Sequence, residues 1–199
     1  MRRIVAAGLG AAGLALTASV AGSGERDVEA LKADALEVAQ SDLKAWIALD
    51  YLVYAIKEQN LRHEGLDDTR IAALDARWIG EGRGGPMASD LLSRQASILL
   101  RDRREEAGGL ITEIMVFDRF GLLVALSDWT EDYLQGDEPK YLRTYPEGPG
   151  TIHVADPERD ESTGRVQIDV SLTVSDPETG EAIGGATISV DPDALAARE

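Results

Sequence analysis

Residues 127–141, SDWTEDYLQGDEPKY, hold one of the three tryptophans and two of the five tyrosines of the chain, and they are densely acidic. Carboxylates beside aromatic faces suit an ammonium or another cation, through ion pairing and cation–π attraction. Ligand pockets are lined by apolar surface and a few convergent polar groups. The stretch therefore predicts a ligand-binding loop, and its candidate residues are Trp129, Asp132, Tyr133, Asp137, Glu138 and Tyr141.

Each candidate also has a structural explanation. The three rings could seal the end of a sheet as ordinary core. Asp137 and Glu138 precede Pro139, so they could instead cap a short helix, and capping is the favoured role for Asp137. Asp169, the seventh candidate, lies on the polar side of an alternating strand and would point either into the pocket or into water. Lys140, like most lysines, is expected on the surface.

Composition excludes several other functions. The net charge of −16 argues against nucleic acid as a partner, because phosphates need a basic face. The chain has no cysteine and two histidines, so we expect no metal site and no cofactor. The acidic run 156–161 has no calcium-loop spacing, and the glycine-rich run 80–85 lacks the strand and the Lys-Ser/Thr of a phosphate loop. No catalytic motif is present, so we expect no enzyme.

The first 21 residues predict a signal peptide. Arg2 and Arg3 precede an apolar stretch, and Ser19 and Ala21 are small residues at the positions that a signal peptidase recognises. The expected cleavage follows Ala21, which places the mature chain in the periplasm or outside the cell. An uncleaved anchor is the alternative, although the stretch is short for a membrane span.

Residues 22–109 predict helices. Leu31, Val38, Ala45 and Leu52 recur every seven residues, and Asp42 interrupts the alternate row. This pattern predicts one long amphipathic helix over about 25–62, whose apolar stripe packs either on the chain's own sheet or on a partner helix. Further helices are expected over 67–78 and 86–104.

Residues 110–199 predict an antiparallel sheet. Apolar and polar residues alternate strictly over 166–174, which is typical of a strand with one buried face. Gly184 and Gly185 predict a close backbone approach. The expected strands are 111–118, 122–127, 151–156, 165–176 and 181–191. The fold class is therefore α+β, with long N-terminal helices followed by a roughly five-stranded antiparallel sheet.

Several segments in this order resemble a known family. A strand ending in Asp118-x-x-Gly121 is followed by LVAxS at 123–127 and by TxDYxQGDE at 130–138. Together they resemble the Cache family of extracytoplasmic sensor domains, of the PhoQ–DcuS–CitA (PDC) type. The resemblance spans about 27–190, and its specific part is 118–141. It implies a PAS-like sheet and a small-molecule pocket between that sheet and the loop after its first hairpin.

Two departures from this family shape the expected function. Relatives that bind amino acids carry Arg and Trp where this sequence has Glu138 and Lys140, and Glu would repel the carboxylate that Arg binds. The sequence also shows no second membrane span and no signalling domain. We therefore expect an exported single sensor domain that binds a small, cationic or amine-bearing molecule and signals through a membrane receptor or a second copy. The alternative is a ligand-free adaptor that dimerises or docks through helix 25–62.

Overall fold

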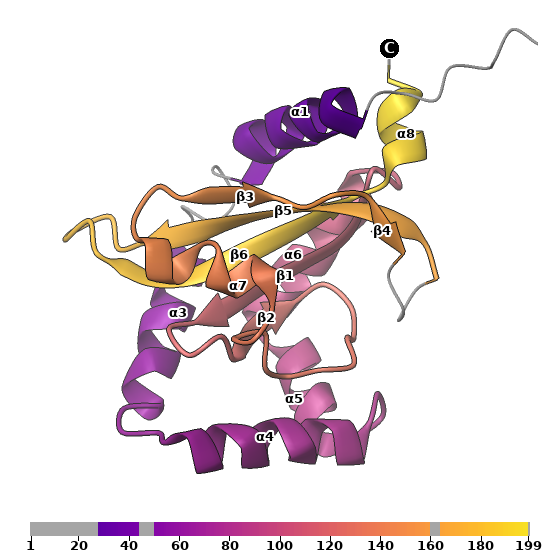
Figure 1. Cartoon of the computed structure of the whole chain (residues 1–199). Coiled ribbons are helices and arrows are strands. Elements are labelled where there is room, and N and C mark those ends of the chain that lie inside the picture. Colours follow the sequence, from indigo (N-terminus) through magenta and orange to yellow (C-terminus); the bar gives the residue numbers. More distant parts are fainter. Residues whose placement is uncertain (1–27, 44–49, 160–163, 199) are drawn as a thin grey trace, which may run out of the picture.

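The computed structural model describes residues 28–43, 50–159 and 164–198, which form helices followed by a sheet (Figure 1). The predicted signal peptide and its cleavage site lie outside these residues. The helical part comprises α1 (Val28–Val38), the π-helix η1 (Ala39–Leu43), α3 (Asp50–Arg62), α4 (Asp68–Glu81), α5 (Pro86–Ser93) and α6 (Gln95–Glu106).

The sheet is antiparallel throughout, in the order β2-β1-β6-β5-β3, with β4 paired to β5. Its strands are β1 (Ile111–Asp118), β2 (Leu123–Leu126), β3 (Ile152–Val154), β4 (Glu158–Arg159), β5 (Val166–Ser175) and β6 (Ala182–Val190). The short helices α7 (Pro139–Leu142) and η2 (Tyr145–Glu147) lie between β2 and β3, and α8 (Pro192–Ala196) follows β6. The predicted α+β fold is confirmed.

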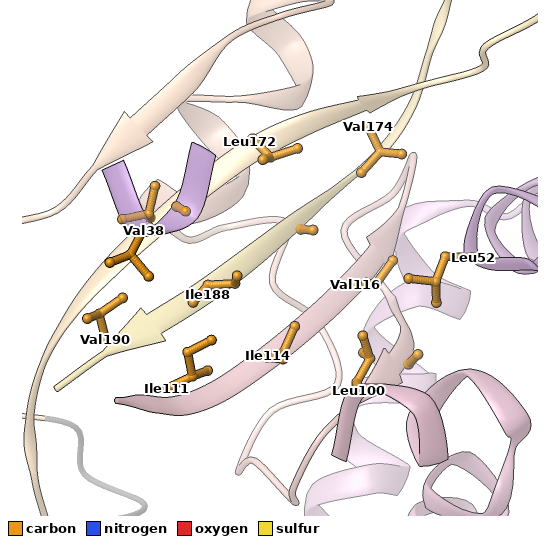
Figure 2. Close-up of a cluster of buried hydrophobic side chains, with 14 of the residues drawn as sticks. Val38, Leu52, Leu100, Ile111, Ile114, Val116, Leu172, Val174, Ile188 and Val190 are labelled. Carbon is orange, nitrogen blue, oxygen red and sulfur yellow. The ribbon is translucent and has the colours of Figure 1, made fainter. Parts of the chain in front are cut away.

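One face of the sheet is apolar and packs on helices. α1 contacts β3 and β5, whereas α3 and α6 contact β1 and β2. Figure 2 shows the resulting core, in which strand side chains meet residues from all three helices; its labelled members are Val38, Leu52, Leu100, Ile111, Ile114, Val116, Leu172, Val174, Ile188 and Val190. The alternation predicted for β5 places Ile168, Val170, Leu172 and Val174 in the main core, whereas Val166 at the start of the strand is 41% exposed.

The other face of the sheet is polar along β5, yet it is also buried there. In β5, Gln167, Ser171 and Thr173 are each less than 9% exposed. α7 packs against β5, and η2 packs against β5 and β6. Figure 1 shows α7 in front of the sheet, on the side away from α6. The chain between β2 and β3 thus covers a surface that is built to form hydrogen bonds.

Two predicted helices differ from the structure. The described part of 25–62 is divided into α1, a π-helical turn and α3, and α1 and α3 run in different directions (Figure 1). The π-helical turn follows Val38, and the Ser41 hydroxyl donates to the Val38 carbonyl (3.0 Å). The predicted helix 86–104 is broken at Arg94, whose ψ of 145° is extended. The break allows Leu91 of α5 and Leu100 of α6 to enter different core clusters.

The structure shows how α4 begins, and it confirms the close backbone approach predicted at Gly184 and Gly185. The Asp67 carboxylate caps α4 by accepting from the N–H of Arg70 (2.9 Å), although the helix continues to Glu81. Gly184 and Gly185 lie against β1, where added Cβ atoms would collide with the carbonyl and the ring of Phe117. Only glycine allows β6 to pair this closely with β1 at that point.

Candidate functional site

The segment 128–138, which connects β2 to α7, folds back along the start of β2. Leu122 and Leu134 form an antiparallel bridge, and the N–H of Leu123 donates to the carbonyl of Tyr133 (3.1 Å). The part of the sequence that carries the family resemblance therefore has a backbone role: it is held beside the first hairpin as a short additional pairing.

Two glycines permit this pairing. Gly121 has a φ of 77°, a left-handed value that favours glycine, and a Cβ there would collide with the backbone of Gly136. A Cβ on Gly136 would in turn lie 2.6 Å from the carbonyl oxygen of Phe120. The N–H of Gln135 donates to the Gly121 carbonyl (2.7 Å), which fixes the crossing of the two chains.

Helix α4 holds the same segment from the other side. One oxygen of Asp75 accepts from the backbone N–H groups of Tyr133 and Leu134, both at 2.9 Å. The indole Nε1 of Trp78 donates to the carbonyl of Thr130 (2.9 Å). These bonds give the segment a fixed position above the polar face of the sheet.

The turn between β1 and β2 is organised by Asp118, whose side chain is fully buried. Its Oδ1 accepts from the N–H groups of Phe120 (2.9 Å) and Leu122 (3.1 Å). Its Oδ2 accepts from Nε2 of Gln59 (3.1 Å) and lies 2.6 Å from Nδ1 of His63. The Asp of the Asp-x-x-Gly motif thus ties α3 to the hairpin.

A cleft of about 330 Å³ lies between the segment 128–138, α7 and strands β3, β4 and β5. We call it the acidic cleft. It is lined by Thr130, Glu131, Asp132, Glu138, Pro139, Lys140, His153, Ala155, Asp156, Glu158, Arg159, Gln167, Asp169 and Ser171. Its floor is the polar face of β5, and its walls contain most of its charged residues.

Three of the seven predicted site residues, Asp132, Glu138 and Asp169, line the acidic cleft. They come from the connecting segment, from the residue before α7 and from β5, so the fold brings together carboxylates that are up to 37 positions apart in sequence. The other four predicted residues are not among its lining. Trp129, Tyr133 and Tyr141 are packed elsewhere, and Asp137 is exposed.

The rings form packed contacts instead. Tyr133 is 5% exposed, and its ring centroid lies 5.5 Å from that of Trp78. Tyr141 packs between Phe117 (5.9 Å) and Tyr145 (5.5 Å). Burial raises the pKa of the phenols of Tyr133 and Tyr141 to about 12 in each case.

The capping role favoured for Asp137 is wrong. Helix α7 begins at Pro139 and has Glu138 at its N-cap position, without a side-chain hydrogen bond to the helix. The Glu138 carboxylate instead turns toward the acidic cleft, where its Oε2 lies 3.2 Å from Nζ of Lys140. The proline fixes where the helix begins, and Glu138 is left available for a different partner.

Lys140 lies among carboxylates on the polar face of the sheet. Its Nζ lies 3.9 Å from Oδ2 of Asp169, and the Ser189 hydroxyl donates to Oδ1 of Asp169 (2.7 Å). Burial alone would lower the pKa of Lys140, but the negative charges of Asp169, Glu138 and Glu113 outweigh burial and hold this pKa above its usual value. The lysine is therefore charged at neutral pH.

Asp132 has the opposite surroundings. Partial burial, followed by the negative charges of Asp75, Glu138, Glu131 and Asp137, raises the pKa of its carboxyl group above the usual value. Within the described part of the chain, its side chain forms no hydrogen bond or ion pair. A positive charge placed beside Asp132 would relieve this repulsion.

His153 of β3 is the one imidazole in the acidic cleft, and it stands opposite Ser171 in the ladder between β3 and β5. Burial, followed by the positive charges of Arg143 and Lys32, lowers the pKa of His153 below its usual value. The ring is thus neutral at physiological pH and available to donate or accept a hydrogen bond.

Lys140, His153, Gln167 and Ser171 also line the cleft, and none of them was predicted from the sequence. Lys140 was expected on the surface, although its side chain is 17% exposed. Gln167 and Ser171 carried a signal, because they share the polar side of β5 with Asp169. No pattern in the sequence shows that β3 brings His153 to the same cleft.

Among the described residues, no group of three or more His, Asp or Glu side chains is placed to hold a metal ion. The described helices likewise include none that is long and apolar enough to cross a membrane.

Comparison with known proteins gives structural likeness alone. No family model matches the sequence, and no curated protein matches it. Similar solved structures include an extracellular ligand binding receptor from Desulfohalobium retbaense, with 17% identity over 73% of this chain and 25% of that chain, at a TM-score of 0.40.

Two further similar structures are sensor domains. The V. cholerae histidine kinase DctB sensor domain has 16% identity over 81% of this chain and 57% of that chain, at a TM-score of 0.38. The sensory domain of the Campylobacter jejuni chemoreceptor Tlp3 has 14% identity over 84% and 59%, at a TM-score of 0.42. The chain thus spans between a quarter and about three fifths of these three proteins.

These neighbours are described as an extracellular ligand binding receptor and as sensor domains.

Proposed function

We propose that this protein is an exported, single Cache/PDC-type sensor domain that binds a small ammonium-bearing molecule in the acidic cleft and signals through a separate partner protein. The observation that carries the proposal is the excess of carboxylates around a cleft whose floor is polar and buried. Six acidic residues line it, against Lys140 and Arg159. Glu138 and Asp169 face Lys140, and Asp156 pairs with Lys32 at 2.8 Å.

The remaining carboxylates favour a cation. Among the described residues, the side chains of Glu131, Asp132 and Glu158 form no ion pair. Clustered like charges raise the local concentration of counter-ions and stabilise a bound cation. The pKa of Asp132 is raised by partial burial first and then by the negative charges around it.

The size of the cleft limits the ligand. A volume of about 330 Å³ is at the lower end of the range for small-molecule sites, which is about 300–1,000 Å³. The buried Gln167 and Ser171 on its floor offer hydrogen bonds to polar atoms of a ligand. A compact, polar amine fits these constraints better than a large apolar molecule does.

The test is calorimetric titration with cadaverine and n-butylamine, and with glutarate and butyrate as matched anions. The amines should bind and the anions should not. A ligand at 100 times its dissociation constant would stabilise the fold by about 2.7 kcal/mol, which thermal unfolding detects. Asp132→Asn should weaken amine binding, whereas Asp137→Asn, an exposed acid of the same segment, should not. Binding of the anions in preference to the amines would contradict the proposal.

A second candidate function is docking through α3, because this helix exposes large apolar side chains. Tyr51, Tyr54 and Leu61 are 47%, 62% and 71% exposed. Their spacing places them along one side of the helix. A second copy or a membrane receptor that covers this stripe would make the protein an adaptor. Light scattering of wild type and of the double variant Tyr54→Lys, Leu61→Lys tests self-association. A wild-type mass that does not change with concentration would exclude a dimer.

A further inference from the structure

Lys140 lies on the four-residue helix α7, yet its side chain is mostly buried. Its side chain is 17% exposed, and its ammonium lies between Glu138 and Asp169. Glu138 is only two positions away, whereas routine ion pairs on a helix surface join residues three or four positions apart. The contact therefore depends on Glu138 turning away from the helix end that it precedes.

The carboxylate of Asp169 on β5 is oriented by a hydrogen bond from the neighbouring strand β6. The Ser189 hydroxyl on β6 donates to Oδ1, so that Oδ2 is the oxygen that faces Lys140. Glu113 on β1 stands opposite Ser189, as Asp169 does from the other side. The polar face of the sheet thus presents a row of acidic and hydroxyl groups to one ammonium.

We propose that the Lys140 ammonium is a built-in occupant of the acidic cleft, which an ammonium-bearing ligand has to displace from Glu138 and Asp169 in order to bind there. This inference rests on the proposed function and specifies the ligand group as a primary ammonium, which is the group that lysine itself carries. Lys140 has a raised pKa and stays charged, so it competes with the ligand over the whole physiological pH range.

The size of the competition depends on the fraction of time for which Lys140 occupies the site. The apparent affinity of a ligand for a site that is free only part of the time falls in proportion to the free fraction. A site that Lys140 occupies for about nine tenths of the time binds an external ammonium about tenfold more weakly than an empty site. A substitution that removes the ammonium of Lys140 but keeps the length of the side chain should restore the lost affinity.

The experiment compares wild type, Lys140→Met and Lys57→Met by calorimetric titration with n-butylamine. Lys57 is the matched control, because its Nζ pairs with Asp176 at 2.7 Å, away from the cleft, and its removal changes the net charge equally. Lys140→Met should bind n-butylamine about tenfold more tightly than wild type, and Lys57→Met should bind it as wild type does.

The outcomes separate this inference from the proposed function. Equal affinity in wild type and Lys140→Met overturns the inference and makes Lys140 a clamp for α7, while the proposed function stands. Absence of amine binding in all three proteins overturns both. If Lys140→Met does not fold, NMR of wild type decides. The Cε–H signals of Lys140, identified by their absence in Lys140→Arg, should move on saturation with n-butylamine; unmoved signals during binding overturn the inference.

Discussion

Nδ1 of His63 lies 2.6 Å from Oδ2 of Asp118. His63 directly follows α3, so this contact joins the end of that helix to the turn between β1 and β2. The Asp118 side chain is fully buried, and that of His63 is 15% exposed. Two backbone N–H groups and Gln59 complete the acceptor contacts of the carboxylate. The most distinctive acid of the sequence motif is therefore a structural junction, located outside the acidic cleft.

Asp118→Ala should destabilise the fold strongly. The change leaves several buried donors without an acceptor, and breaking a buried pair in this way costs about 3 kcal/mol or more. Urea unfolding should show a lower midpoint at an unchanged slope. Asp137→Ala, on an exposed acid, should change the free energy of unfolding by no more than about 0.5 kcal/mol. Similar losses for the two variants would contradict the role given to Asp118.

Gly121→Ala should cost more than Gly180→Ala. The two glycines have nearly the same φ, 77° and 76°, so an alanine pays the same left-handed strain of about 1 kcal/mol at either position. At Gly180 the added Cβ enters open space, whereas at Gly121 it collides with the backbone of Gly136. We expect Gly121→Ala to lose a further 1–3 kcal/mol or so by denaturant unfolding, as overpacking does. Equal losses would show that the crossing at Gly136 is easily displaced.

Asp132→Asn should stabilise the protein slightly while weakening amine binding. The folded-state pKa of Asp132 is raised, so its charge opposes folding at neutral pH, and stability is regained as the pH falls through that raised pKa. Since the side chain is largely exposed and screened, the gain should be at most about 0.5 kcal/mol. Thermal unfolding and titration with n-butylamine measure both effects. A variant that loses stability at neutral pH would contradict this assignment.

Alkaline unfolding should reveal the two buried phenols. Tyr133 and Tyr141 have pKa values of about 12, against 10.0 for an unperturbed tyrosine. The folded protein keeps these protons after the unfolded chain has lost them, so the free energy of unfolding falls as the pH rises from 10 toward 12. Tyr133→Phe removes one titrating hydroxyl and should reduce this loss. An identical pH dependence in wild type and Tyr133→Phe would contradict the burial effect.

The sequence predicted the sheet well because strand periodicity is local. The strict alternation around Asp169 predicted both the core face of β5 and the polar face that became the floor of the cleft. The π-helical turn at Ala39–Leu43 and the break at Arg94 were not predictable, because neither Ser41 nor Arg94 is a proline or glycine and tertiary packing decides the local structure. The side-chain partners of Asp118 are Gln59 and His63, which are more than 50 residues away, and no local pattern in the sequence indicates them.

For the site, the residue types predicted the chemistry of the cleft better than they predicted which side chains line it. The acidic character of 127–141 predicted carboxylates in a pocket, and Asp132 and Glu138 line it. The same stretch supplied rings that pack as ordinary core, the alternative that its composition left open. Lys140 was assigned to the surface by the general behaviour of lysine, and only the fold shows that two acids enclose it.

The hydrogen bonds from α4 to the segment 128–138 have a mechanical consequence. Asp75 and Trp78 hold the wall of the cleft through three bonds to backbone atoms. Any occupant that draws this wall toward the sheet must either break those bonds or carry α4 along with it. The position of α4 on the outside of the molecule is therefore coupled to the position of the cleft wall.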